Sequence, residues 1–285
     1  MDSPGLAAAL ALAPGLFWLW FFARKNSYRP EPRRLVATTF ILGMLSTVPA
    51  AGIEAFFIKD SLEQPGVTLG TVAVNMFFFV GPVEELSKFL AVRLNAYRSR
   101  YFEEPMDGLV YAAAASLGFA SLENFFYILN YGPEVIVARA PLSTLAHLVF
   151  GSFWGYALGL AWRRQGASRW VVPGLAIAAT MHAFFDVAAF GGNVGIAVGL
   201  VALGAFWTVS RFNWARRVSP FRYRRNYPLL TCPHCQQRVR VTFTTCPRCG
   251  SQMHRGRSPL ICGNCLAINR ADAAFCTQCG DRFEG

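Results

Sequence analysis

Seven apolar segments fill most of residues 1–214 and constrain the fold more than any other feature of the chain. A run of about 20 apolar residues forms a helix long enough to cross the hydrocarbon core of a bilayer. The segments are 5–23, 35–57, 69–90, 107–129, 142–162, 170–190 and 194–210. Because 54% of the residues are hydrophobic and 15% are charged, an intrinsically disordered chain is excluded. We therefore expect an all-α multi-pass membrane protein.

Basic residues are distributed unevenly between the two ends of these segments. The gaps after the first, third and fifth segments and the stretch after the seventh hold 17 Lys and Arg, whereas the opposite gaps hold only Lys59 and Arg139. Positive residues favour the cytoplasmic side, so we expect the N-terminus outside the cell membrane and the C-terminus in the cytoplasm. The first segment precedes its basic residues, which favours a retained anchor over a signal peptide. Most of the net charge of +11 is explained without a nucleic-acid-binding surface.

All eight cysteines lie in the C-terminal tail, in two copies of the pattern C-x2-C-x10-C-x2-C offset by 30 residues. They are Cys232, Cys235, Cys246, Cys249, Cys262, Cys265, Cys276 and Cys279. Two close thiolate pairs complete a tetrahedral zinc site, and thiols stay reduced in the cytoplasm, which disfavours disulfides. We predict two structural zinc ions in a small β-rich double zinc ribbon over residues 229–285. A basic linker, 215–228, would join it to a membrane domain of residues 1–214.

Each ribbon is too small for a hydrophobic core, so metal binding should supply its folding energy. Four thiolates close the coordination shell, which indicates a structural metal and leaves His234 and His254 outside the ligand set. The function of the ribbons is then recognition of a cytoplasmic protein partner or of nucleic acid. The ribbons alone do not decide between these, and we favour the protein partner.

Several ionisable residues fall in or near the apolar segments. A carboxylate at the bilayer centre costs roughly 2.5–3.5 kcal/mol, and such residues are candidates for function. Any one of them could make a packing contact, but two histidines and several carboxylates in four segments should converge, because they would otherwise be unpaired in lipid. A convergent cluster would supply a general base and metal ligands. The residues are Glu54, Glu84, Glu85, Lys88, Asp107, Glu123, His147, His182 and Asp186.

The third segment contains the sequence Gly81-Pro-Val-Glu-Glu-Leu-Ser-Lys88. Pro82 suits the first turn of a restarted helix, whose N-terminal dipole would favour the carboxylates that follow. Lys88 lies four residues from Glu84 and three from Glu85, so it can pair with either. A structural ion pair would explain Lys88 and one carboxylate but would leave the other without a partner.

The histidine segments have their own local patterns. His182 and Asp186 share a helix face at i, i+4, so Asp186 would orient His182 or join the site. Gly151, one turn after His147, allows close approach of another backbone. The alternative for Glu123 is a polar helix-packing contact made together with its neighbour, Asn124.

Depth in the membrane is a difficulty for a compact site. Counted from the expected segment ends, Glu123, His147 and His182 lie in the outer half of the membrane, and Glu84 and Glu85 lie nearer the inner half. A helix break at Gly81-Pro82, or a different boundary for the third segment, would reconcile them.

These motifs together resemble the PrsW family of intramembrane proteases, which is related to the CAAX prenyl endopeptidases. The resemblance covers roughly residues 35–212, and the zinc ribbons lie outside it. It implies hydrolysis of a membrane-anchored substrate, such as an anti-sigma factor, on its extracytoplasmic side. The matching motifs are Glu84-Glu85-x-x-Lys88, Phe119-x-x-x-Glu123, His147 with Gly151, and His182 with Asp186.

The resemblance also implies roles for these residues, which we state as a hypothesis. Glu84 or Glu85 would take a proton from water, while His147 and His182 would bind a catalytic zinc or stabilise the oxyanion. In addition, Asp186 would orient His182, and Glu123 would be a further ligand or polar support.

Two other functions fit the same features. A non-enzymatic membrane scaffold would recruit a cytoplasmic partner through its ribbons. A transporter would use a broken helix at Gly81-Pro82, although the segments show no inverted repeat. Clustering of Glu84 or Glu85 with His147 and His182 around one water would favour the protease.

Overall fold

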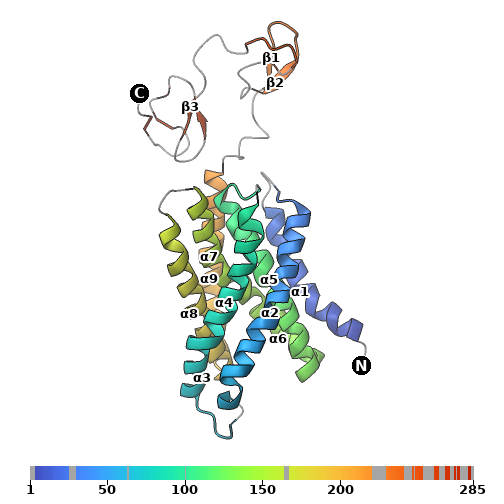
Figure 1. The fold of residues 1–285 in the computed structure, drawn as a ribbon, viewed down its shortest axis with the longest axis vertical. Coiled ribbons are helices and arrows are strands. Elements are labelled where there is room, and N and C mark those ends of the chain that lie inside the picture. Colours follow the sequence, from blue (N-terminus) through green and yellow to red (C-terminus); the bar gives the residue numbers. More distant parts are fainter. Residues whose placement is uncertain are drawn as a thin grey trace. The chain divides into compact units, whose positions relative to one another are not determined.

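A computed structural model gives the fold of the chain (Figure 1). It describes residues 4–25, 30–62, 64–99, 101–163, 167–219 and, in the tail, 229–240, 246, 248–252, 260–262, 267–269, 273, 275, 276, 282 and 283. The chain divides into two compact units, Met1–Asn213 and Trp214–Gly285.

Seven helical runs among the described residues are long and apolar enough to cross a membrane, which confirms the predicted number. In chain order they consist of α1 (Pro4–Lys25); α2 (Arg33–Leu62); α3 (Leu69–Asn75), η1 (Met76–Val80), α4 (Gly81–Leu94) and η2 (Ala96–Arg98); α5 (Pro105–Tyr131); η3 (Pro133–Val135), α6 (Ile136–Ala138), η4 (Arg139–Ser143) and α7 (Thr144–Arg163); η5 (Ala167–Trp170) and α8 (Val171–Phe190); and α9 (Val194–Val218). The start of α1 and the end of α9 lie at opposite ends of the bundle, as an odd number of crossings requires (Figure 1).

Helix α5 lies at the centre of the bundle, where it packs against α1, α2 and α7. Every residue of α5 from Pro105 to Ser121 is buried, and many are Ala, Gly or Ser. Small side chains let helix backbones approach closely within a membrane. At Gly118, for example, a Cβ atom would lie 2.0 Å from the Phe40 carbonyl oxygen of α2, so only glycine fits there.

The third crossing differs from its predicted form. It extends to Arg98 instead of residue 90, and the expected break at Gly81-Pro82 is a π-helical turn, η1, that leads into α4 without leaving the helical conformation. With the longer run, Glu84 and Glu85 lie near the middle of the crossing. The different boundary therefore removes the mismatch in depth.

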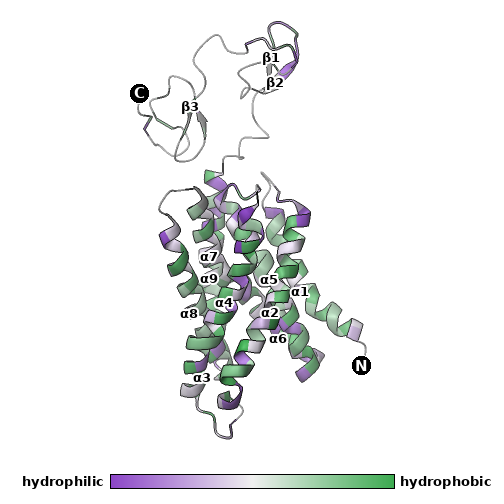
Figure 2. Ribbon diagram, in the orientation of Figure 1, coloured by the Kyte–Doolittle hydropathy of each residue, from purple (hydrophilic) through white to green (hydrophobic). Residues whose placement is uncertain are grey.

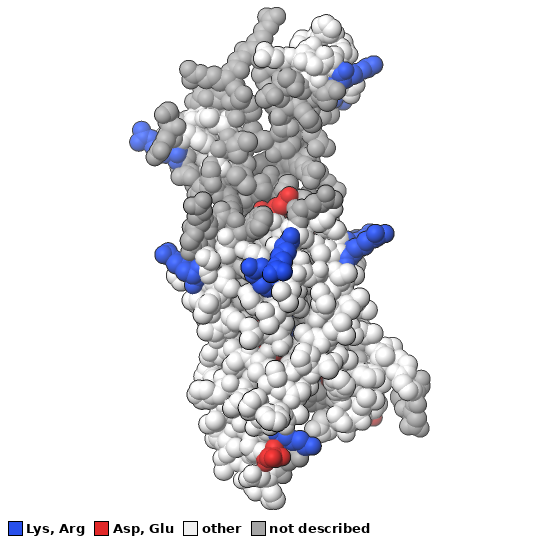
Figure 3. Space-filling view, viewed as in Figure 1, with Lys and Arg blue, Asp and Glu red and all other residues white. Residues whose placement is uncertain are grey.

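Hydropathy and charge vary along the length of the helices. Apolar residues dominate the bundle in Figure 2. On the face shown in Figure 3, charged side chains of the described helices gather near the two ends, and the middle of the bundle is almost free of them. This is the distribution expected for helices that cross a bilayer.

The C-terminal unit contains short antiparallel strand pairs. Strand β1 (Leu229–Thr231) pairs with β2 (Arg238–Arg240), and β3 (Leu260–Ile261) pairs with β4 (Ile268–Asn269). The turn between β1 and β2 begins at Cys232, whose backbone N–H donates to the Gln237 carbonyl (2.9 Å). Helix α9 continues past residue 214 to Val218, and residues 220–228 of the predicted linker lie outside the described residues.

Candidate active site

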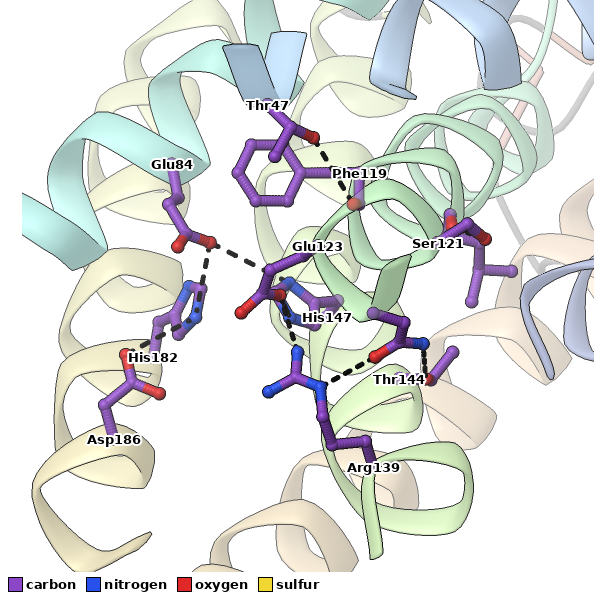
Figure 4. Close-up of polar contacts among 12 residues, drawn as sticks. Thr47, Glu84, Phe119, Ser121, Glu123, Arg139, Thr144, His147, His182 and Asp186 are labelled. Atoms are coloured by element: carbon purple, nitrogen blue, oxygen red, sulfur yellow. Dashed lines mark hydrogen bonds and ion pairs between the residues drawn. The ribbon is translucent and has the colours of Figure 1, made fainter. Parts of the chain in front are cut away.

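Four helices bring the predicted site residues together inside the bundle (Figure 4). Helix α4 provides Glu84, Glu85 and Lys88, and the other three helices provide one or two residues each. Glu84, His182 and Asp186 face Glu123 and His147 across the site in Figure 4. The contributions of α5, α7 and α8 are Glu123, His147, and His182 with Asp186, respectively.

Lys88 is the central cation of the cluster and is completely buried. Its ammonium group donates to Glu84 Oε2 (3.1 Å) and Glu85 Oε1 (2.9 Å), and lies 2.9 Å from His147 Nδ1. An ammonium has three N–H donors, so these contacts use all of them and require Nδ1 of His147 to accept. Lys88 therefore pairs with both carboxylates, where a simple ion pair would have left one without a partner.

Glu85 has its acceptor positions occupied from three directions. Its Oε1 also contacts His182 Nδ1 (3.1 Å), and its Oε2 accepts a hydrogen bond from Trp154 Nε1 (2.9 Å). Sequence reasoning missed Trp154, because an aromatic residue in an apolar segment usually signals only core packing. Since its neighbours are all donors, we infer that Glu85 positions Lys88 and His182.

Glu84 is the more open carboxylate of the pair. Its Oε2 lies 3.5 Å from His182 Nε2 and 4.0 Å from His147 Nδ1. No hydrogen bond from the described residues reaches its Oε1. His182 Nε2 is also 3.6 Å from Asp186 Oδ2, and this pair shares a helix face as the spacing predicted.

Glu123 joins His147 to a residue that the sequence had placed in an external loop. Glu123 Oε2 lies 2.8 Å from His147 Nε2 and 2.9 Å from Arg139 Nη2. The sequence could have indicated Arg139, because it is one of only two basic residues on the predicted outer side.

Three other residues singled out in the sequence lie differently. Asp107 is at the start of α5, where it accepts hydrogen bonds from the backbone of residues 103 and 104 and takes no part in the cluster. Glu54 interacts electrostatically with Glu84, but its buried Oε1 has no hydrogen-bond partner among the described residues. Gly151 faces the Ser116 hydroxyl rather than another backbone.

A metal ion fits part of this cluster. Ligand atoms of Glu84, His147 and His182 lie within 4.8 Å of one another, and all three residues are buried. Two histidines and one glutamate are a known donor set for catalytic zinc. The hydrogen bond that His182 Nδ1 donates to Glu85 is also the kind of outer contact that orients a metal-binding imidazole.

The first ribbon has the geometry of a four-thiolate site. Sγ atoms lie 3.6 Å apart in the Cys232–Cys249 and Cys235–Cys246 pairs, close to the separation of about 3.8 Å that tetrahedral Zn–S bonds give. The six cysteines that the structure describes form no disulfides. In the second ribbon, Cys262 and Cys276 are buried near each other, whereas Cys265 and Cys279 lie outside the described residues.

The fold and the site define a class of protein: a multi-pass membrane protein that holds carboxylates and histidines together between its helices. Residues 31–212 match the family described as PrsW family intramembrane metalloprotease, and residues 232–280 match the double zinc ribbon. The chain belongs to the PrsW family, and it is an intramembrane protease with a C-terminal double zinc ribbon.

Relatives that carry the name of the family agree with this assignment. Protease PrsW of Bacillus subtilis (strain 168) is 33% identical over 177 residues, which cover 61% of this chain and 78% of that protein. Protease PrsW of Geobacillus kaustophilus (strain HTA426) is 36% identical over 150 residues, which cover 53% of this chain and 64% of that protein. No solved structure matches this chain.

Proposed function

We propose that the protein is an endopeptidase that hydrolyses a peptide bond of a membrane-anchored protein by means of water activated at Glu84. The observation that supports this is the convergence of Glu84, His147 and His182 from three helices. Such a cluster is costly inside a membrane, and the scaffold function gives it no chemical purpose. The transporter function needed a broken helix at Gly81-Pro82, where η1 instead leads into α4 without leaving the helical conformation.

The two carboxylates of α4 have different tasks in the proposed reaction. Glu84 acts as the base, because its Oε1 is open, and it takes a proton from the attacking water. Glu85 keeps Lys88 and His182 in place, since its oxygens already accept from three donors. The proton held by Glu84 then passes to the amine that leaves when the C–N bond breaks.

Glu84 through Oε2, together with His147 and His182, would hold a catalytic zinc ion, which leaves Oε1 of Glu84 free to act as the base. When bound, such an ion lowers the pKa of its water and polarises the scissile carbonyl. The chain itself orients His182 through Glu85 and Asp186. If His147 binds the ion through Nδ1, the Lys88 ammonium must move away from that atom.

The proposed topology follows the distribution of basic residues. The N-terminus would lie outside and the ribbons, after a linker over residues 215–228, in the cytoplasm. The implied substrate is a single-pass membrane protein of the anti-sigma-factor kind, cut on its extracytoplasmic side. The ribbons, over residues 229–285, would bind a cytoplasmic protein partner.

Cleavage of a reporter with one transmembrane segment tests the catalytic proposal. The full-length protein and its Glu84→Gln and His182→Ala variants would be incubated with the reporter in liposomes, with Glu134→Gln in η3 as a matched surface carboxylate variant. We expect both site variants to be inactive and Glu134→Gln to cleave at the wild-type rate. Wild-type cleavage by Glu84→Gln and His182→Ala would refute the proposal.

Metal analysis of the full chain tests the cofactor. We expect three zinc ions per chain, of which one is lost in His182→Ala. Two ions in the wild type, unchanged in His182→Ala, would favour the metal-independent glutamate mechanism.

A further inference from the structure

Arg139 has an unusual position for a basic residue in a transmembrane protein. It begins η4, a π-helical turn within the crossing from Pro133 to Ala161, and its side chain is only 12% exposed. Its charge is therefore not explained by topology. Ionisable groups buried at membrane depth are costly, so they pair with other groups and usually serve a function. π-Helical turns are also frequent at functional sites.

Besides Glu123, two residues of α5 hold the guanidinium of Arg139 in place. Its Nε donates a hydrogen bond to Asn124 Oδ1 (2.8 Å), and the central carbon of the guanidinium, Cζ, lies 3.7 Å from the centre of the Tyr127 ring. The amide of Asn124 is itself oriented, because its Nδ2 donates to Thr144 Oγ1 (3.0 Å). The planar guanidinium is thus held along one edge and one face.

The remaining edge of the guanidinium faces the site. Arg139 Nη2 and His147 Nε2 approach the same oxygen of Glu123, at 2.9 and 2.8 Å. On the other side of the imidazole ring, Nδ1 accepts from Lys88, so Nε2 must bear the ring proton, and this nitrogen is the one that lies 2.8 Å from Glu123 Oε2. Lys88 and Glu123 therefore hold His147 in one orientation and tautomer from its two sides, and Arg139 holds Glu123.

We propose that Arg139 is a positioning residue of the active site, which keeps Glu123 against His147 so that Nδ1 of the ring faces Glu84. Without Arg139, Glu123 loses its nearest cation among the described residues and is free to turn away from the ring. The catalytic part of this inference rests on the proposed function, whereas the orientation of His147 does not.

A double-mutant cycle tests the catalytic part. We expect Arg139→Gln to lower kcat about 10- to 100-fold, the usual effect of losing a residue that orients a catalytic ligand, with KM unchanged. Arg139→Lys should restore little, because one ammonium cannot contact Asn124 and Glu123 in the same forked geometry. Lys59→Gln, which removes the other basic residue of the predicted outer side, should leave kcat unchanged.

The cycle is completed with Glu123→Gln. If Arg139 acts through Glu123, adding Arg139→Gln to Glu123→Gln should cause no further loss of kcat. Multiplicative losses in the double variant, or a wild-type kcat in Arg139→Gln, would overturn the proposal.

Histidine labelling tests the orientation without an activity assay. The chain has four histidines, so ¹⁵N-histidine labelling gives few NMR signals, and His147→Gln identifies the signal of His147. We expect the Nε2-protonated tautomer in the wild type and a mixed or reversed tautomer in Arg139→Gln, with nearly the same change in Arg139→Lys. An unchanged His147 tautomer in both variants would refute positioning even if the protein cleaves its substrate, whereas the expected change without cleavage would refute only the proposed function.

Discussion

Replacing Glu85 by glutamine should destabilise the fold more than any other isosteric change of a carboxylate in the site. The carboxylate accepts from Lys88 and His182 at Oε1 and from Trp154 at Oε2. A glutamine side chain offers one accepting oxygen and one donating NH2 group. In either orientation of the amide, the NH2 group of Glu85→Gln faces at least one donor, which is left without an acceptor.

The loss of stability in Glu85→Gln can be estimated from the hydrogen bonds and the ion pair that are lost. A buried donor without a partner costs about 1–3 kcal/mol, and removing one member of a buried ion pair costs about 3–5 kcal/mol. These figures overlap, because they count the same contacts. Since Glu84 still pairs with Lys88, the lower end applies, about 3 kcal/mol. At about 2–4 °C per kcal/mol for a unit of this size, Tm should fall by about 6–12 °C.

Thermal unfolding in detergent, followed by circular dichroism, measures this effect. The matched control is Glu54→Gln, which makes the same chemical change at a carboxylate whose buried Oε1 has no hydrogen-bond partner among the described residues. We expect Glu54→Gln to keep or raise Tm. An unchanged Tm in Glu85→Gln, or equal losses in both variants, would refute the view that Glu85 holds the site together through its three donors.

Three further changes test other parts of the structure. Cys246→Ser should lose one zinc ion per chain, measured by metal analysis, because the first ribbon needs all four thiolates. Gly81→Val should abolish cleavage and lower Tm, because a Cβ atom there would lie 2.4 Å from the Ala179 carbonyl oxygen, one turn before His182. Burial, reinforced by Asp107, raises the pKa of Glu31, just before α2, to about 10. Since the folded state then holds this proton more tightly than an unfolded chain does, Tm should fall as pH rises from about 4.5 to 10, and Glu31→Gln should flatten that dependence.

The transmembrane helices and the first zinc ribbon could be predicted because each leaves a local pattern. A helix that crosses a bilayer needs a continuous apolar run, and a thiolate pair on a tight turn needs Cys-x-x-Cys. Helix ends are less certain, because neighbouring structure decides where a run stops. The third crossing extends to Arg98 for this reason, and the error of one to two turns had separated Glu84 from His182 in depth.

The division of work within the site could not be predicted from sequence. Glu84 and Glu85 are adjacent and identical in type, and only the positions of Trp154 and His182 show that Glu85 is the one surrounded by donors. Both of those contacts come from helices that lie far along the chain. Similarly, the sequence suggests that Arg139 is a charged residue of an external loop, whereas the structure places it in a π-helical turn against Glu123.

The charges of the site favour a bound cation. Among the described residues, five carboxylates share this region of the bundle with two permanent cations, Lys88 and Arg139. With all five carboxylates ionised, the excess negative charge would be costly in a medium of low dielectric constant, and Lys88 has no donor left to offset it. A divalent ion would neutralise most of the excess, and the ligand atoms closest together include one carboxylate and two imidazoles that suit zinc. A divalent cation held by this cluster would fit the description of the family, to which the chain belongs, as metalloproteases.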